Sequence, residues 1–173
     1  PRNMQMQRKI NLKIKYREGF RPFAPSVLEE DYSDFFEGES MSPYMLMVKK
    51  IQEKIKIRVP QEYWKLNYWN KLYTKRSELQ SITHVDFSAR IQTVSKRTNQ
   101  RYWSLINEFK KITNVGILVN TSFNVRGEPI VNNPEDAFKC FMNTEMDVLV
   151  IGDFIYFKKE QTSKVDKQQF KND

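Results

Sequence analysis

The segment 119–131, which reads VNTSFNVRGEPIV, carries the densest group of side chains able to perform chemistry. Asn120 and Ser122 offer neutral hydrogen bonds, and Arg126 offers a permanent positive charge. Gly127 allows the backbone to approach a ligand or to turn with positive φ. The β-branched run just before this segment has the composition of a buried strand, and α/β proteins bind ligands at the carboxyl ends of strands. The same residues also suit an ordinary strand-to-loop corner in which Asn and Ser bond the local backbone.

Three further side chains are candidate cations for an anionic ligand: Lys15, Arg21 and Arg90. Arg90 lies between two apolar residues in an extended run, where an inward-pointing cation is costly unless it is paired. Taken alone, Lys15 and Arg21 are typical of solvated surface residues. The residue types by themselves therefore single out Arg90 more clearly than the other two.

Three long motifs resemble the C-terminal domain of the O-carbamoyltransferase family, which includes nodulation proteins and antibiotic carbamoyltransferases. They read INLKIKYREGFRPFAPS (10–26), THVDFSARIQTV (83–94) and NTSFNVRGEPIVNNPEDAF (120–138). They occur in the family's order, and the resemblance spans roughly residues 1–157. Phe87 stands where the family usually has glycine, which bears on the backbone geometry near Arg90.

This resemblance implies an α+β fold of the YrdC/Sua5 type, with a curved mixed β-sheet and flanking helices. It implies formation of carbamoyl adenylate from carbamoyl phosphate and ATP, the ATP bound with magnesium. The matching positions assign catalysis to Lys15, Arg21 and Arg90, and assign binding of the nucleotide and carbamoyl group to these three with Asn120 and Ser122. The resemblance implies no metal-binding residue in this chain.

The five implied positions make physical sense together. ATP and carbamoyl phosphate bring several negative charges close together, and fixed cations offset their mutual repulsion. The forked guanidinium groups of Arg21 and Arg90 suit phosphate oxygens, while Lys15 would act as a compact point charge. As charge grows on the α-phosphate and the departing pyrophosphate, cations placed in advance stabilise the transition state. We therefore predict that the three cations meet in one hollow beside the Ser122 hydroxyl.

In the resembled family a larger N-terminal domain, similar to Kae1, carries metal-binding histidines and transfers the carbamoyl group to a hydroxyl of a small-molecule acceptor. We expect that domain to be the partner of this chain, to hold its own metal, and to choose the acceptor. The chain is then expected to be a C-terminal fragment that cannot perform the overall transfer alone.

Composition sets limits that do not depend on the resemblance. A chain of 173 residues can bury a core as one domain, which we predict over 1–159, with an insertion near 52–80 and a polar, disordered tail at 160–173. The formal net charge of +8 favours an anionic partner. No apolar run approaches the roughly 20 residues of a membrane span, so we expect a cytoplasmic protein without a membrane partner.

Two other classes of function remain open from the sequence. The net charge and the interleaved aromatic residues of 52–80 also suit a nucleic-acid-binding module, although nucleic acid is not the partner we expect. In that reading Trp and Tyr side chains beside Lys71, Lys75 and Arg76 stack on bases; otherwise the segment is a flap that packs on its own domain. A docking domain with an empty pocket is the third reading.

The helices and strands that would position these residues are predicted from the periodicity of apolar residues and from the residues that interrupt regular structure. Helices are expected at 3–16, 100–113 and 134–143, although the alternation of apolar and charged residues within 3–16 also fits a strand. Extended segments are expected at 20–28, 44–50, 82–94 and 115–120, and a hairpin is expected at 147–158. Proline restricts 20–28 to an edge or bulged strand. The helix over 62–69 places Trp64, Tyr68 and Leu72 at fourfold spacing. The predicted core stripe of 100–113 consists of Tyr102, Leu105, Ile106, Phe109 and Ile112.

Three other residue types have structural interpretations. His84 is predicted to bond Asp86, because one histidine and one distant cysteine do not form a metal-ligand set. An ion pair between Arg126 and Glu128 is predicted to fix the loop. Cys140, the single cysteine, is predicted to be a packed and inert thiol.

Overall fold

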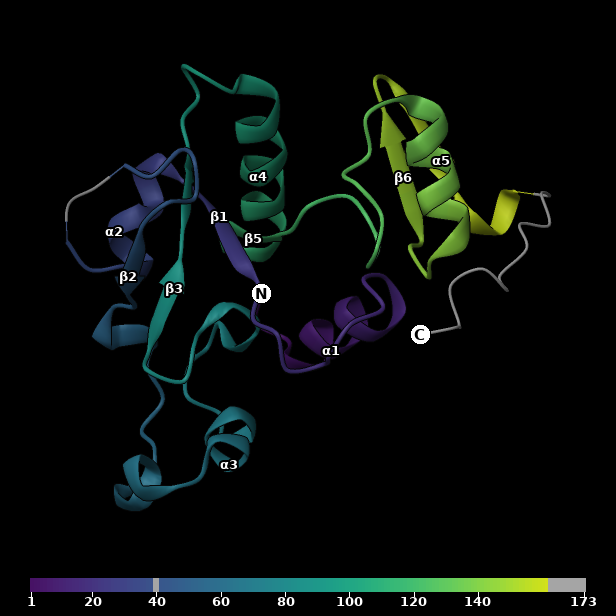
Figure 1. Cartoon of the computed structure of the whole chain (residues 1–173). Coiled ribbons are helices and arrows are strands. Elements are labelled where there is room, and N and C mark those ends of the chain that lie inside the picture. Colours follow the sequence, from purple (N-terminus) through teal and green to yellow (C-terminus); the bar gives the residue numbers. More distant parts are fainter. Residues whose placement is uncertain (39–40, 162–173) are drawn as a thin grey trace. The chain divides into compact units, whose positions relative to one another are not determined.

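The computed structural model describes residues 1–38 and 41–161, and its chain divides into two compact units (Figure 1). The first unit comprises residues 1–7 and 20–121, and the second comprises 8–19 and 122–173. The tail predicted over 160–173 lies outside the described residues from 162 onward. Each unit is described by itself below.

The core of the first unit is a three-stranded mixed sheet of order β4-β1-β5 covered by helix α4 (Figure 1). Strand β1 (Ala24–Leu28) runs parallel to β4 (Gln92–Val94) and antiparallel to β5 (Ile117–Asn120). Helix α4 (Gln100–Thr113) begins at Asn99, whose side chain accepts from the Tyr102 amide, and ends at Asn114 with φ 58°. Ile106 of α4 packs against Leu28 and Val94 of the sheet, which buries all three.

Strand β1 corrects the prediction that residues 20–28 form an edge or a bulge. It is the central strand, and all five of its residues are buried. Pro25 is tolerated because pairing with β4 covers only Ser26 to Leu28, whereas Pro25 lies opposite Val119 of β5 alone. At Pro25 the central strand is therefore locally an edge, where a missing N–H donor is permitted.

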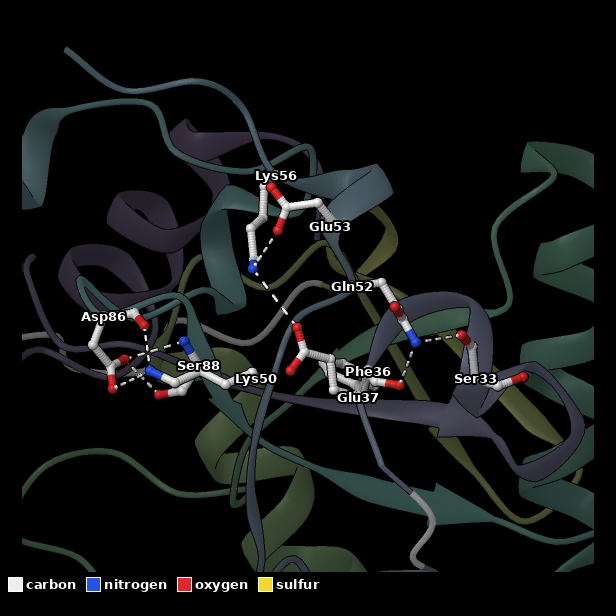
Figure 2. A network of polar contacts seen from close by, with 9 residues as sticks. All are labelled: Ser33, Phe36, Glu37, Lys50, Gln52, Glu53, Lys56, Asp86 and Ser88. Carbon is white, nitrogen blue, oxygen red and sulfur yellow. Dashed lines mark hydrogen bonds and ion pairs between the residues drawn. The ribbon is translucent and has the colours of Figure 1, made fainter. Parts of the chain in front are cut away.

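A second, two-stranded sheet joins β2 (Val48–Lys50) to β3 (Ser88–Arg90) in antiparallel register. Short turns surround it: η1 (Glu29–Asp31), α2 (Tyr32–Phe35), η2 (Glu53–Ile55) and η4 (Gln80–Ile82). Figure 2 shows how polar side chains connect these pieces. Gln52 Nε2 donates to the carbonyls of Ser33 and Phe36, and Lys56 forms ion pairs with Glu37 and Glu53. The predicted strand over 44–50 is shorter than expected, since Met45 has φ 58° and interrupts it.

Where a single helix was predicted over 62–69 of the segment 52–80, the structure has two short ones. The 3₁₀ helix η3 (Gln61–Lys65) ends before Asn67, whose side chain accepts from the Asn70 amide and begins α3 (Tyr68–Tyr73). Tyr63 is buried and its hydroxyl donates to the Val85 carbonyl. Part of the segment therefore packs on the first unit as the self-packing interpretation expects.

Helix α1 (Met4–Lys13) settles the ambiguity of the N-terminal segment in favour of a helix, although it ends earlier than predicted. The Asn3 carboxamide accepts from the Gln5 amide at the start of the helix. Past its end, Tyr16 takes the left-handed conformation with φ 48°, which usually favours glycine after a helix.

In the second unit, helix α5 (Pro134–Asn143) packs on the hairpin of β6 (Val148–Ile151) and β7 (Phe154–Phe157), followed by η5 (Lys158–Glu160). The helix has the predicted bounds: the Asn133 side chain accepts from the Asp136 amide and Pro134 occupies the first turn. Gly152 turns the hairpin with φ 59°. Phe141 and Leu149 form the buried centre of this cluster.

The fold is α+β, as predicted, but its strands form three separate small sheets in the described residues. The core stripe predicted for α4 is partly wrong: Ile106 is buried, whereas Leu105 is exposed and Ile112 is 85% exposed. Among residues 1–38 and 41–161, no helix has both the length and the apolar character needed to cross a membrane.

Candidate functional site

Lys15 lies just beyond the C-terminal end of α1, where the local backbone directs its side chain inward. Its amide donates to the carbonyl of Ile10, five residues back, and its own carbonyl accepts from the Arg126 amide. The residue is only 4% exposed. A lysine this deeply buried requires oxygen partners for its ammonium group.

The loop 122–128 supplies those partners. Lys15 Nζ lies 2.8 Å from the Ser122 carbonyl, 3.1 Å from Ser122 Oγ, 2.7 Å from the Asn124 carbonyl and 2.6 Å from Asn124 Oδ1. Ser122 Oγ donates to Asn124 Oδ1 at 2.7 Å, and Asn124 Nδ2 donates to the Glu128 carbonyl at 2.9 Å. Because an ammonium group has three N–H donors, four neighbouring oxygens satisfy it fully. Lys15 thus fixes the shape of the loop and the direction of an exposed serine hydroxyl.

The electrostatics of Lys15 are unusual for a lysine. The pKa of Lys15 is lowered from 10.5 to about 8, mainly by burial and secondly by the Arg17 guanidinium, while Cys140 partly opposes them. Arg17 is held in place by its Nε, which donates to Asn11 Oδ1 at 2.7 Å. Two cationic side chains therefore lie close together beside the Ser122 loop. Such a concentration of positive charge in one unit is suited to an anionic ligand.

Asn120 belongs to the first unit, at the end of β5. Its Nδ2 donates to Gln92 Oε1 at 2.7 Å, and the Ser26 hydroxyl donates to the same oxygen at 2.7 Å. Gln92 Nε2 in turn donates to the Pro43 carbonyl. The Asn120 carboxamide is thereby oriented across the sheet, which leaves its own Oδ1 as an acceptor for an N–H donor.

Arg90 is exposed at the end of β3, and a rigid turn precedes it. Asp86 accepts from the Ser88 amide at 3.1 Å, from the Ser88 hydroxyl at 2.6 Å and from Lys50 at 3.2 Å (Figure 2). Phe87, where the resembled family has glycine, takes φ 63° within this turn. The Asp86 contacts hold a conformation that phenylalanine rarely adopts.

His84 was expected to bond Asp86, but its direct partner is Ser88, with Nδ1 to Oγ at 3.1 Å. The Ser88 hydroxyl has one proton and donates it to Asp86, so His84 Nδ1 must be the donor and Nε2 bears the lone pair. Burial lowers the pKa of His84, which favours this neutral form. The interpretation of His84 as a structural hydrogen-bonding residue therefore holds, with a different partner.

Arg21 is exposed in the extended segment before β1. Its backbone is fixed by Gln7, whose Nε2 donates to the carbonyls of Phe20 at 3.2 Å and Arg21 at 3.0 Å. These two hydrogen bonds fix the backbone at Arg21.

The structure brings together two of the five predicted residues, Lys15 and Ser122, in the second unit. Arg21, Arg90 and Asn120 belong to the first unit. The convergence of all five on one hollow stays a prediction.

Sequence reasoning missed Asn124 and Arg17, which complete the Lys15 cluster. Their spacing gave a usable signal: Arg17 is two residues from Lys15, and Asn124 is two residues from Ser122. The ion pair predicted between Arg126 and Glu128 is absent from the part of the chain that the structure describes; these residues fix the loop through backbone groups instead. Cys140 is buried as predicted, and burial raises the pKa of its thiol.

Comparisons with known proteins agree with these motifs. A nodulation protein, NolO, from Bradyrhizobium diazoefficiens is 43% identical over 92% of this chain and 26% of its own length. A 3'-hydroxymethylcephem-O-carbamoyltransferase from Amycolatopsis lactamdurans is 32% identical over 85% of this chain and 24% of its own length. An uncharacterized protein from Synechocystis sp. is 53% identical over the whole chain and 28% of its own length.

The chain spans about a quarter of the length of these curated relatives. The family model described as "Carbamoyltransferase C-terminus" matches residues 1–158, which include all three motifs and both units' candidate residues. The chain therefore belongs to the carbamoyltransferase C-terminus family.

Proposed function

We propose that this chain is the carbamoyl-activating part of an ATP-dependent O-carbamoyltransferase. It would bind ATP and carbamoyl phosphate. Hydrolysis of carbamoyl phosphate would release inorganic phosphate and leave carbamate, and a carbamate oxygen would then attack the α-phosphate of ATP, which releases pyrophosphate and gives carbamoyl adenylate. A Kae1-like N-terminal domain would then transfer the carbamoyl group to the hydroxyl of a small-molecule acceptor. Family membership supports the reaction class, and one relative is named as an O-carbamoyltransferase.

The observation that carries this proposal is the Lys15 cluster. A buried ammonium group holds the exposed Ser122 hydroxyl and the Asn124 carboxamide in one orientation, with a second cation, Arg17, close by. Groups oriented before the substrate arrives need little reorganisation during the reaction, which is the main source of electrostatic catalysis. This cluster is suited to hold the carbamoyl group, because a carbamoyl group offers both an amide donor and a carbonyl acceptor.

The geometry changes the role that we assign to Lys15. Its three N–H donors already point to oxygens of the loop, so it acts as a positioning residue and as a local source of positive charge. Arg21 and Arg90 are solvent-accessible and would contact the phosphates directly. In this arrangement the arginines stabilise the charge that develops at the α-phosphate and on the pyrophosphate, while Asn120 and Ser122 orient the acyl group.

Magnesium would accompany the nucleotide. Within the described ranges, no three His, Cys, Asp or Glu side chains gather into a metal-binding group. Mg²⁺ commonly binds substrate phosphates with few protein ligands, so the residues fit an ion that the ATP phosphates hold. When bound, it would supply charge neutralisation at those phosphates.

The proposal includes a fold of the YrdC/Sua5 type, in which the mixed sheet of the first unit forms part of one curved sheet. The parallel pairing of β1 with β4 beside the antiparallel pairing of β1 with β5 supports it. Asn120 lies at the end of that sheet, where the predicted ligand-binding edge would be.

Isothermal titration calorimetry with ATP and with carbamoyl phosphate tests the proposal. We expect saturable binding of both, and a loss of about tenfold or more in ATP affinity in Arg90→Ala, because a charge-assisted contact is lost. Arg97→Ala, which removes an exposed arginine from the same unit, is the matched control and should bind as the unaltered chain does. Absence of binding to either ligand, or an Arg90→Ala variant that binds normally, would contradict the proposed site.

A further inference from the structure

An aromatic cluster of the 52–80 segment lies directly beside the backbone that carries Arg21. The Phe20 ring makes edge-to-face contacts with Trp69, at 5.4 Å between centroids, and with Tyr68, at 6.5 Å. Tyr68 and Trp69 also contact each other, at 5.9 Å. Since Phe20 immediately precedes Arg21, these rings of α3 lie within one residue of a predicted phosphate-binding cation.

These rings are only partly covered by their contacts. Trp69 remains 53% exposed, and Tyr68 is exposed to a similar extent. Edge-to-face packing covers part of each ring and leaves aromatic surface open to a flat ligand. Large aromatic side chains left in solvent at a fixed position often mark a binding surface.

The charge around the rings indicates an anionic ligand. Residues 57–75 carry the cations Arg58, Lys65, Lys71 and Lys75 and a single carboxylate, Glu62. Lys71 Nζ, on the same helix as Trp69, lies 5.9 Å from the centre of the Trp64 ring, so a cation of this segment lies beside one of its aromatic rings. A ligand that combines a flat aromatic group with negative charge matches both features, and a nucleotide is such a ligand.

We propose that Trp69, with Tyr68, forms the nucleobase subsite for the nucleotide whose phosphates Arg21 holds. This inference rests on the proposed function, because it needs a nucleotide at Arg21. The base would stack on the open surface of Trp69, and the phosphates would extend toward Arg21. The interleaved cations of α3 and its flanks would favour the same anionic ligand over an acceptor without charge.

A comparison of two probes separates stacking from charge. ATP carries both a base and a triphosphate, whereas inorganic tripolyphosphate carries only the charges. We expect Trp69→Ala to weaken ATP binding about tenfold, in line with base–aromatic stacking. Tripolyphosphate binding should change less than twofold, and Trp69→Phe should restore most of the ATP affinity because it retains a ring.

Tyr73→Ala is the matched control, since Tyr73 lies on the same helix and is exposed; it should leave both affinities unchanged. Fluorescence gives a second readout: with Trp64→Phe and Trp103→Phe, the remaining Trp69 emission should be quenched by ATP and unaffected by tripolyphosphate. Thermal unfolding should show that each variant is folded.

Several results would overturn the subsite. If Trp69→Ala weakened ATP and tripolyphosphate equally, the rings would only position Arg21; if it changed neither, they would not contact the ligand. Trp69 quenching by an acidic peptide or a single-stranded oligonucleotide with no response to ATP would assign the surface to a macromolecule. If the unaltered chain did not bind ATP, the proposed function would be contradicted. If it bound ATP and Trp69→Ala left the affinity unchanged, only the subsite would be contradicted.

Discussion

Each unit contains a buried cation surrounded by neutral oxygens, and the two cations differ in what they can do. In the second unit Lys15 contacts oxygens of Ser122 and Asn124. In the first unit Arg76, only 2% exposed, donates from Nη1 to the Thr83 carbonyl at 2.9 Å and from Nη2 to the carbonyls of Lys71 and Leu72. Within the described residues neither cation has a carboxylate partner.

The difference between these cations separates a structural role from a functional one. Arg76 binds carbonyls in the C-terminal turn of α3, where the helix dipole is negative, and an arginine keeps its charge at any ordinary pH. Its burial rules out the contact with bases considered for it from the sequence. Lys15 lies under an exposed hydroxyl, and its lowered pKa allows it to lose its proton near pH 8. A permanent cation holds the fold, whereas a titratable one can tune a site.

The largest effect is expected for Arg76→Met. The carbonyls of Lys71, Leu72 and Thr83 would lose their donor, and unsatisfied buried acceptors should lower the free energy of unfolding by about 3 kcal/mol. Urea denaturation measures this change. The exposed neighbour Lys75, changed to Met, should stay within about 0.5 kcal/mol of the unaltered chain. Equal stability of Arg76→Met and Lys75→Met would show that the buried guanidinium does not hold α3.

Lys15→Met should have its main effect on binding. The lowered pKa of Lys15 means that burial penalises its ammonium group, so removing this charge offsets part of the stability lost with its hydrogen bonds. The Ser122 loop would lose the ammonium group that its oxygens share. We expect the affinity for carbamoyl phosphate, measured by calorimetry, to fall about 100-fold, because the site loses a positive charge and its hydrogen-bonding groups are no longer held in place. Lys139→Met, at an exposed lysine of α5, is the control and should bind normally. Normal binding by Lys15→Met would remove Lys15 from the site.

A third effect is expected from pH, and its sign follows from the lowered pKa of Lys15. Below about pH 8 Lys15 is protonated in both the folded and the unfolded chain, so the free-energy cost of burying its ammonium group does not change with pH. Between about pH 8 and 10.5 the unfolded chain binds more protons at this residue than the folded chain does, so the stability contributed by Lys15 rises with pH. The difference in unfolding free energy between the unaltered chain and Lys15→Met should therefore shift in favour of the unaltered chain across this window.

Over the same window carbamoyl phosphate affinity should fall, because the site loses a positive charge as Lys15 deprotonates. A flat difference in stability between pH 8 and 10.5, measured by urea denaturation at matched ionic strength, would show that the Lys15 ammonium is not penalised by burial.

Much of the fold was predictable where local chemistry decides it. Asn133 and Pro134 begin α5 at the expected residue, and Gly152 turns the expected hairpin, because capping and positive φ depend on neighbouring residues. The prediction failed where distant partners decide. Leu105 and Ile112 have the periodicity of a core stripe, yet both are exposed, because the face of α4 that packs on the sheet carries Tyr102, Trp103 and Ile106. Pro25 was assigned to an edge because the limited extent of β4 pairing was not visible in the sequence.

The candidate site shows the same division. The motifs identified Lys15 and Ser122, and the family comparisons agree with the motifs. They did not show that Lys15 is enclosed by loop oxygens, that Asn124 joins Ser122 to it, or that Ser88 stands between His84 and Asp86.

The sequence alone determined which residue types were present, where helices start and turn, and to which family the motifs point. Only the tertiary structure decided that the ammonium group of Lys15 meets the Ser122 hydroxyl from a distance of 107 residues along the chain. The reason is physical: caps and turns use hydrogen bonds between neighbours, whereas the partners and the pKa of a buried charge depend on which segments fold over it.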